Sequence, residues 1–491
     1  MKIYDTYTKY HGKIDFRKIV PKHTPLFEIE QKKDFSRLTK SHVRKNSLQV
    51  LNLFTEKFEG RDNPIGEFKS ILELSTRAPY CPCPFVLDTM MGVCSYSCIY
   101  CFTSLTISSL MTAFFDGENI LAPRYASPEY VKNYLTEVLR ARDSEPFERL
   151  PENDSCGSTT DIKSLKKASS QRIPLRFGTR SENFLPAEKI KGSALTALEV
   201  IKSFDYPLII NTKSDLILQE PYFKIISEMG KNVAIQVSVI HMDDNISKKL
   251  EPGAPSPTQR WEVLKTFNQI GINAMPRMEP CAEFLNADDE HLIRYFDKAK
   301  ESCCKSFMGD LYHHTVSATE IQRMFNREGF DFDRMWEATA EYQILGSYSM
   351  EKAMYYAKKN GLKAGTFNFH SLPWMDSQVC CMVSDQFKNW NKYSAIHFMK
   401  NELIEGNKMG FTEFDEKYYG YELHGGIRKR LRQVWDYKIK NCFNFDFCEG
   451  VIPIGKDDDG HIIYKFDSSR IGEGYENIIK TWGDKNVEKT T

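Results

Sequence analysis

The stretch Cys94-Ser95-Tyr96-Ser97-Cys98-Ile99-Tyr100-Cys101 carries three thiols, with three and two residues between them. A short loop with this spacing can turn all three sulfurs onto one small metal core, and thiolates are soft ligands that suit iron–sulfur clusters or zinc. A structural zinc site has four protein ligands, whereas a four-iron cluster held by three cysteines keeps one iron open. The spacing therefore favours an iron–sulfur site. The alternative is a zinc knuckle with Cys81 or Cys83 as fourth ligand.

Apolar segments of strand length alternate with helical segments around this loop. The pattern predicts strands at 84–90, 172–179, 206–212, 233–240, 272–279 and 305–312, and helices at 127–142, 193–204, 221–229, 258–270 and 287–302. Such alternation is typical of parallel βα units. Six units predict an α/β fold, a partial (β/α)6 barrel in which ligands lie at the carboxyl ends of the strands. The cysteine loop follows the first of these strands, which is where such a site belongs.

The flanking regions differ in composition from this barrel, assigned to residues 81–312. Residues 1–80 form a basic N-terminal extension, and its first 50 residues hold twelve Lys and Arg against five Asp and Glu, a balance of +7. Residues 143–171 are rich in Ser, Lys, Glu and Asp, and we expect a flexible surface insertion there. Residues 313–491 are predicted to be mainly α-helical, with helices at 318–325, 332–359 and 393–405 and a hairpin at 448–466.

Bulk composition describes an ordinary globular chain. Of 491 residues, 41% are hydrophobic and 27% charged, the formal net charge is +0, and the length suits two or three domains. The chain has no apolar segment near its start and no run long enough to span a bilayer. With thirteen cysteines, this predicts a cytoplasmic protein, away from membranes, whose thiols serve metals rather than disulfides.

Several local motifs resemble one known protein family. The cysteine loop, with glycine ahead of it and an aromatic before its last cysteine, resembles the signature of the radical S-adenosylmethionine (SAM) superfamily. Further stretches resemble its spore photoproduct lyase and "DNA repair photolyase" subgroup; these are Gly178-Thr179-Arg180-Ser181-Glu182 with Pro186-Ala187-Glu188, Asn211-Thr212-Lys213-Ser214, Ser238, and residues 250–260. The motifs follow one another at the spacing of barrel strands.

The resemblance implies an enzyme with two cofactors. Cys94, Cys98 and Cys101 would hold a [4Fe-4S] cluster, which would cleave SAM reductively to a 5′-deoxyadenosyl radical that abstracts hydrogen from the substrate. By the same resemblance the cofactor-binding residues would be Tyr100 beside adenine, Lys213 facing the SAM carboxylate, and three polar contacts, Thr179, Ser181 and Ser238. Glu251 and Arg260 are expected to pair and shape the loop after the fourth strand. A flavodoxin- or ferredoxin-like protein would supply the electron.

One departure from the subgroup concerns the hydrogen donor. Spore photoproduct lyases carry a donor cysteine in the loop after the second barrel strand, and Gly178-Thr179 stands there instead. Cys281 and Cys156 are the candidates to replace it. The pairs Cys303-Cys304 and Cys380-Cys381, with Cys442 and Cys448, leave a second metal site open. The catalytic residues that handle the substrate therefore stay unassigned.

Three functions compete at this stage. The leading one is radical SAM chemistry on a nucleic acid or nucleotide, which the photolyase-like loops and the basic N-terminal arm favour. A second is radical SAM chemistry on a protein or small metabolite, recognised by the C-terminal region. A third is a binding module stabilised by zinc and without turnover. A redox relay that carries a cluster but no SAM is a further alternative.

Overall fold

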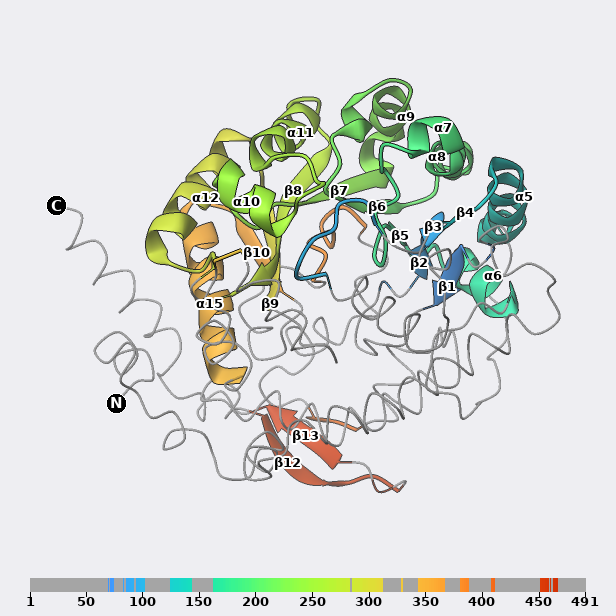
Figure 1. Ribbon diagram of the computed structural model, residues 1–491. Coiled ribbons are helices and arrows are strands. Elements are labelled where there is room, and N and C mark those ends of the chain that lie inside the picture. Colours follow the sequence, from blue (N-terminus) through green and yellow to red (C-terminus); the bar gives the residue numbers. More distant parts are fainter. Residues whose placement is uncertain are drawn as a thin grey trace, which may run out of the picture.

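The structure is a computed structural model of the chain. It describes residues 69, 71–74, 83, 85–91, 94–101, 124–143, 162–282, 285–311, 328–329, 343–366, 380–387, 408–410, 451–458, 460 and 462–466. Most of these belong to one curved layer of strands with helices along its outer side (Figure 1).

The central sheet confirms the six predicted strands. They are β2 (Phe85–Leu87), β5 (Leu175–Phe177), β6 (Leu208–Thr212), β7 (Val233–Ser238), β8 (Asn273–Cys281) and β9 (Ser306–Leu311). Each is paired in parallel with the next in chain order. Every residue of β6 and β7 is buried, as expected for strands covered on both faces. The α/β fold and the barrel-like order of strands are thus as the alternation predicts.

Both edges of the sheet extend beyond the range assigned to the barrel. Strand β1 (Leu72–Leu74) pairs antiparallel with β2, and β10 (Lys363–Thr366) pairs parallel with β9. The order is β1-β2-β5-β6-β7-β8-β9-β10, with β1 and β10 as outer strands of an open sheet. A strand from the predicted N-terminal extension and one from the predicted helical region therefore complete the same layer.

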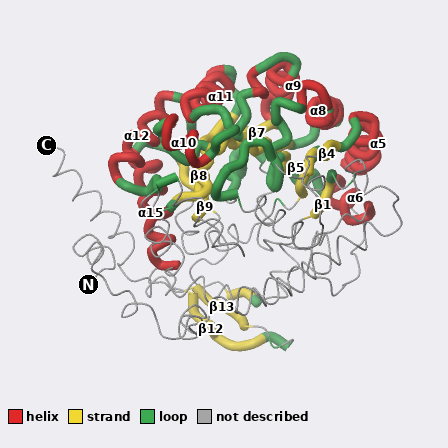
Figure 2. Tube along the Cα trace, viewed as in Figure 1, coloured by secondary structure: helices red, strands yellow, loops and turns green. Residues whose placement is uncertain are grey.

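Helices lie outside the strands and follow one another around the sheet in sequence order (Figure 2). They include α5 (Pro128–Leu139), α8 (Ser193–Ser203), α9 (Tyr222–Met229), α11 (Pro257–Gln269), α12 (Asp289–Glu301) and α15 (Gln343–Lys359). Capping residues mark the N-termini of some of these helices. Ser127 caps α5, and Ser256 with Gln259 forms a capping box on α11. Among the described helices, none combines the length and apolar character needed to cross a bilayer.

The segment predicted as a flexible insertion contains an ordered helix. Helix α6 (Ile162–Ser170) buries Leu165 and Ala168 completely and contacts α5 and β1. The prediction is therefore wrong for residues 162–170. Spacing i, i+3 puts these two apolar residues on one face, which is enough to dock a short helix onto an existing core although its composition is polar.

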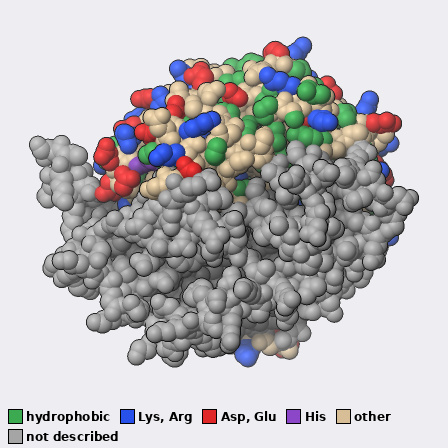
Figure 3. All heavy atoms as spheres, viewed as in Figure 1, with side chains coloured by type: hydrophobic (Ala, Val, Ile, Leu, Met, Phe, Trp, Pro, Cys, Tyr) green, Lys and Arg blue, Asp and Glu red, His purple; other side chains and the backbone are tan. Residues whose placement is uncertain are grey.

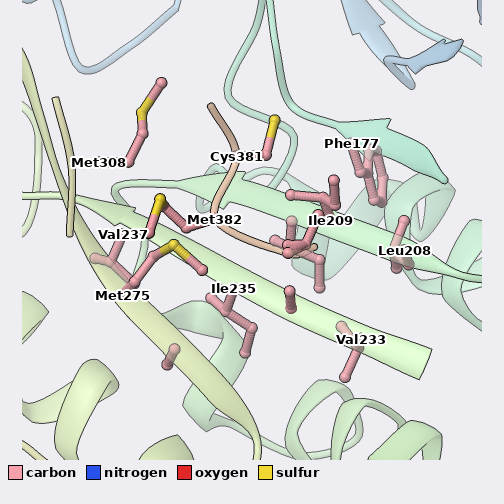
Figure 4. Packing of buried hydrophobic residues seen from close by; sticks show 14 of the residues in the cluster. Phe177, Leu208, Ile209, Val233, Ile235, Val237, Met275, Met308, Cys381 and Met382 are labelled. Carbon is pink, nitrogen blue, oxygen red and sulfur yellow. The ribbon is translucent and has the colours of Figure 1, made fainter. Parts of the chain in front are cut away.

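The described parts of the C-terminal region include strands as well as helix α15. Residues 380–387 lie against the sheet, where Cys381 and Met382 cross the central strands (Figure 4). A separate sheet consists of β11 (Lys408–Met409), β13 (Ile462–Phe466) and β12 (Val451–Lys456), and β12 and β13 form the hairpin expected at 448–466. The helices predicted at 318–325 and 393–405 lie outside the described residues.

The outer face of the helical layer has mixed charge. Lys and Arg side chains are interspersed with Asp and Glu over the described helices of this face (Figure 3). Because charges of both signs alternate, the described part of this face offers no extended basic surface for a phosphate backbone. The basic segment at residues 1–50 lies outside the described residues.

Candidate metal and cofactor site

The cysteine loop follows β3 (Met90–Met91), which pairs with β4 (Arg124–Tyr125). Two tight turns shape the loop: the Ser97 amide donates to the Cys94 carbonyl at 3.2 Å, and the Cys101 amide donates to the Cys98 carbonyl at 3.1 Å. Tyr96, Ile99 and Tyr100 are buried, whereas the three cysteines are partly exposed. The apolar side chains thus anchor the loop while its thiols remain accessible.

The loop after α10 (Asp244–Leu250) clamps the cysteine loop. The Ile99 amide donates to the Leu250 carbonyl at 2.9 Å, and the Gly253 amide donates to the Tyr96 carbonyl at 3.0 Å. Glycine is required there because a Cβ at position 253 would lie 2.2 Å from the Ser95 carbonyl oxygen. Residues 150 positions apart in sequence therefore hold the thiols in place.

A buried carboxylate links this clamp to the cysteine loop. The Tyr100 hydroxyl and the Arg260 guanidinium both donate to Glu251, and the Ser247 hydroxyl donates to it at 3.0 Å. The Lys213 ammonium lies 3.8 Å from the same carboxylate and 5.6 Å from the centre of the Tyr100 ring. Burial acts to raise the pKa of Glu251, but Arg260 and Lys213 outweigh it, so the pKa is lowered and the carboxylate is ionised.

Arg260 is the second centre of this network and is fully buried. It also donates to the carbonyls of Ser238 at 2.7 Å and Pro255 at 2.9 Å. The predicted pairing of Glu251 with Arg260 is therefore confirmed. The ion pair ties the end of β7 to the clamp, which brings Tyr100, Lys213 and Ser238 of the predicted set to one place.

The thiols are influenced by their surroundings and by one another. Burial raises the pKa of Cys94 to about 12 and also raises that of Cys98. Lys213 opposes the shift at both thiols, and the charge of Cys101 adds to it at both. Burial therefore favours the neutral form of both thiols. Within the described residues, no three His, Cys, Asp or Glu side chains are preassembled as a metal site.

The loop after β5 is held to the chain between β2 and β3. The Ser181 hydroxyl lies 2.9 Å from Asp88 Oδ1 and 2.8 Å from the Met90 carbonyl oxygen, and the Asn183 amide donates to Asp88 at 3.1 Å. Arg180 forms an ion pair with Asp88 at 3.3 Å. Burial raises the pKa of Asp88, although Arg180 acts against it. Ser181, predicted as a cofactor contact, thus fixes this loop to Asp88 in the structure.

Glu182 connects the same loop to the next strand. It accepts hydrogen bonds from the Lys213 amide at 2.7 Å and the Thr212 hydroxyl at 2.8 Å. Its negative charge also raises the pKa of Cys94, so it lies near the cysteine loop. Glu182, like Asp88, is missed by the sequence analysis as a site residue, although Asp88 is the only charged residue in the apolar run 84–91. Thr179, in contrast, has a buried hydroxyl without a partner among the described residues.

Comparison with known proteins gives structural neighbours only. No family model matches the chain, and no curated protein matches it. The chain is similar to spore photoproduct lyase. A structure of that enzyme with dinucleoside spore photoproduct matches with a TM-score of 0.38 and 14% identity, over 58% of this chain and 76% of the lyase.

Two further solved structures are similar to the chain over part of its length. TYW1 with a lysine-pyruvate adduct matches with a TM-score of 0.30 and 13% identity, over 56% of this chain and 79% of that chain. Streptococcus suis SuiB bound to S-adenosylmethionine matches with a TM-score of 0.25 and 14% identity, over 37% of this chain and 41% of SuiB. Likenesses of this size assign no reaction to the chain.

The other cysteines have contacts of their own or lie outside the described residues. Cys281 Sγ lies 3.7 Å from the Ser349 carbonyl on α15, so this thiol faces the helical layer. Cys304 is buried beside Asn268, and Cys83 is hydrogen-bonded to Cys381. The position of Cys281 argues against its use as a hydrogen donor near the cysteine loop. Cys81, Cys156, Cys442 and Cys448 lie outside the described residues.

Proposed function

We propose that this chain is a radical SAM enzyme in which Cys94, Cys98 and Cys101 bind a [4Fe-4S] cluster. The observation that carries the proposal is a loop of three partly exposed thiols, clamped at the carboxyl ends of parallel strands. When bound, the cluster would supply the electron that cleaves SAM to methionine and a 5′-deoxyadenosyl radical. Parallel strands place ligands at this edge, and soft thiolates suit this metal group.

The donor set fits such a cluster in kind and number. Three cysteine ligands leave one metal position open, and neutral thiols lose their protons when metal binds. Because burial raises the pKa of Cys94, cluster binding there would release a proton. Because the thiols are not preassembled, they would draw together around the metal while the buried Tyr96, Ile99 and Tyr100 keep the loop anchored.

Lys213 and Tyr100 would orient the second cofactor. Burial acts to lower the pKa of Lys213, but Cys98 and Glu251 outweigh it and the pKa is raised, so Lys213 carries its positive charge. A charged ammonium at the end of β6 suits the carboxylate of SAM, and the face of Tyr100 suits an adenine ring. Thr179 supplies a hydroxyl that has no hydrogen-bond partner among the described residues, and Ser238 is the last residue of β7. Ser181 would act by holding the loop that carries Thr179.

The proposed substrate is a nucleic acid or nucleotide. The photolyase-like motifs and the basic segment at residues 1–50 support this choice. Ionic contacts to phosphates weaken with salt, so binding that falls steeply with added salt would support it, and salt-insensitive binding of a protein or metabolite would favour the second candidate. A flavodoxin- or ferredoxin-like partner would reduce the cluster.

The test is anaerobic reconstitution of the full chain with iron and sulfide, followed by dithionite and SAM. Chromatography of 5′-deoxyadenosine is the readout, with Cys98→Ala as the inactive variant and the exposed Cys303→Ala as its matched control. A brown protein that forms 5′-deoxyadenosine, with only Cys98→Ala silent, supports the enzyme. A colourless protein that retains zinc supports the binding module, and a brown protein that leaves SAM intact supports the redox relay. Either of the last two refutes the proposal.

A further inference from the structure

Two amide side chains lie side by side on the central strands. Asn211 on β6 and Gln236 on β7 are register partners in the parallel ladder. Partners in a parallel ladder point to the same face of the sheet and lie about 5 Å apart. Gln236 fixes which face this is, because its Nε2 donates to the Cys381 carbonyl at 3.0 Å. Cys381 belongs to the segment that crosses the sheet in Figure 4.

Both amides are buried and incompletely bonded. Asn211 is 3% exposed and Gln236 is 0% exposed. Among the described residues, Asn211 Oδ1, Asn211 Nδ2 and Gln236 Oε1 have no hydrogen-bond partner. Buried polar atoms in folded proteins are nearly always paired, and each unpaired one costs stability. Three such atoms on neighbouring strands are therefore available to pair with a ligand.

The rest of the fold satisfies a buried asparagine where its role is structural. Asn286 is 0% exposed, accepts from the Ala282 amide at 2.9 Å, and donates to the carbonyls of Ile240 at 2.7 Å and Pro280 at 2.8 Å. Asn211 has none of these bonds, although its backbone is tightly held. At Gly178 of the neighbouring strand end, a Cβ would lie 2.3 Å from the Asn211 carbonyl oxygen. The backbone of Asn211 is thus fixed in position, while its side-chain amide makes no hydrogen bond to the described residues.

The chemistry of these atoms limits the class of ligand that could bind them. They offer a donor and two acceptors without charge, which suits neither a phosphate nor a carboxylate. A carboxamide pairs with a group that presents a donor and an acceptor on one edge, as nucleobases do. A trans peptide group fits poorly because its N–H and C=O point in opposite directions.

We propose that Asn211 and Gln236 form a recognition site for the edge of a nucleobase. The inference deepens the proposed function and rests on it for the two sources of such a base: the adenine of SAM, or a base of a substrate nucleotide. The Cys381 carbonyl orients Gln236 for this role. The hydroxyl of Thr179, two residues after β5, is a further polar atom without a partner in the described part of the chain.

The test uses Asn211→Leu in the full, metal-free chain, with Asn286→Leu as matched control. Removing an unpaired buried amide should leave the melting temperature unchanged or raise it, whereas Asn286→Leu, which loses made bonds, should lower it. Calorimetric titration with SAM and with a thymidine dinucleotide should show at least tenfold weaker binding to Asn211→Leu for one of them. The ligand that loses affinity identifies the source of the base. Asn211→Asp, which keeps acceptors but loses the donor, should weaken the same ligand.

Three outcomes overturn the inference. These are a melting temperature of Asn211→Leu lowered as far as that of Asn286→Leu, unchanged affinity of Asn211→Leu for both ligands, or an unmodified chain that binds neither. The experiment needs no cluster and no turnover. Failure of the proposed function, seen as absent 5′-deoxyadenosine, is therefore separate from failure here.

Discussion

Removing the charge of Glu251 is expected to destabilise the protein strongly. In Glu251→Gln the side chain can still accept from Tyr100, but Arg260, which is fully buried, loses its counter-charge. Breaking one side of a buried ion pair costs about 3–5 kcal/mol, because the remaining charge stays desolvated. Arg260 keeps its bonds to the carbonyls of Ser238 and Pro255, so we expect the lower end, about 3 kcal/mol.

Urea unfolding of the metal-free chain, followed by circular dichroism at pH 7, measures this loss. The matched control is Glu301→Gln, which breaks an exposed pair with Lys298 (3.0 Å) and should change stability by less than about 1 kcal/mol. The double variant Glu251→Gln/Arg260→Met should be more stable than Glu251→Gln alone, because it no longer buries an uncompensated guanidinium. A loss below about 1 kcal/mol in Glu251→Gln would refute the account of the network.

The pH dependence provides an independent check on the same residue. The pKa of Glu251 is lowered in the folded chain from its ordinary 4.5, so its contribution is present above pH 4.5 and is lost as the pH falls through the folded value. The stability difference between the unmodified chain and Glu251→Gln should therefore shrink below pH 4.5. A difference that grows on acidification would contradict the ionised state.

Three further changes test other parts of the structure. Gly253→Ala should lower the iron bound per chain after reconstitution, because its Cβ would meet the Ser95 carbonyl oxygen at 2.2 Å and displace the cysteine loop; iron content equal to the unmodified chain would contradict the clamp. His291, whose pKa burial lowers from 6.5 to about 3, should cost about 2 kcal/mol of stability between pH 7 and pH 5, and His291→Phe should remove that loss in urea unfolding at the two pH values. Burial raises the pKa of Glu188 to about 7, so its favourable neutral form is fully present below pH 4.5 and lost as the pH rises through 7. Glu188→Gln should then be about 3 kcal/mol more stable than the unmodified chain at pH 8. If the variant and the unmodified chain are equally stable at both pH 4 and pH 8, this account of Glu188 is wrong.

The regular part of the fold was predictable because its signals are local. The apolar runs of β6 and β7 and the Ser-Pro start of α5 are visible in the sequence and need no partner to be recognised. Strands β1 and β10 are only three and four residues long, and their identity depends on the neighbour with which they pair. Helix α6 was missed for the same reason, since its few apolar residues gain meaning only from the core they meet.

In the candidate site, too, local patterns were predictable from the sequence and long-range contacts were not. Three thiols in one loop are a local pattern, whereas the bond from Tyr100 to Glu251 joins residues 151 positions apart. The use of Ser181 to hold Asp88, rather than to point freely into the site, also depends on a contact across 93 positions. Unpartnered atoms such as those of Asn211 have no signature in sequence, because being unpaired is a property of the surroundings.

The clamp on the cysteine loop also sets an order of events during synthesis. Strands pair in the sequence in which they emerge, so the sheet can grow from β2 onward while translation continues. The loop that carries Cys94, Cys98 and Cys101 emerges early, yet Leu250 and Gly253, which hold it, arrive some 150 residues later. We therefore expect the cysteine loop of ribosome-bound chains to be held in place only after about residue 260 has left the exit tunnel. A maturation system that delivers iron and sulfide would then meet a correctly held loop only after four of the six central parallel strands have formed.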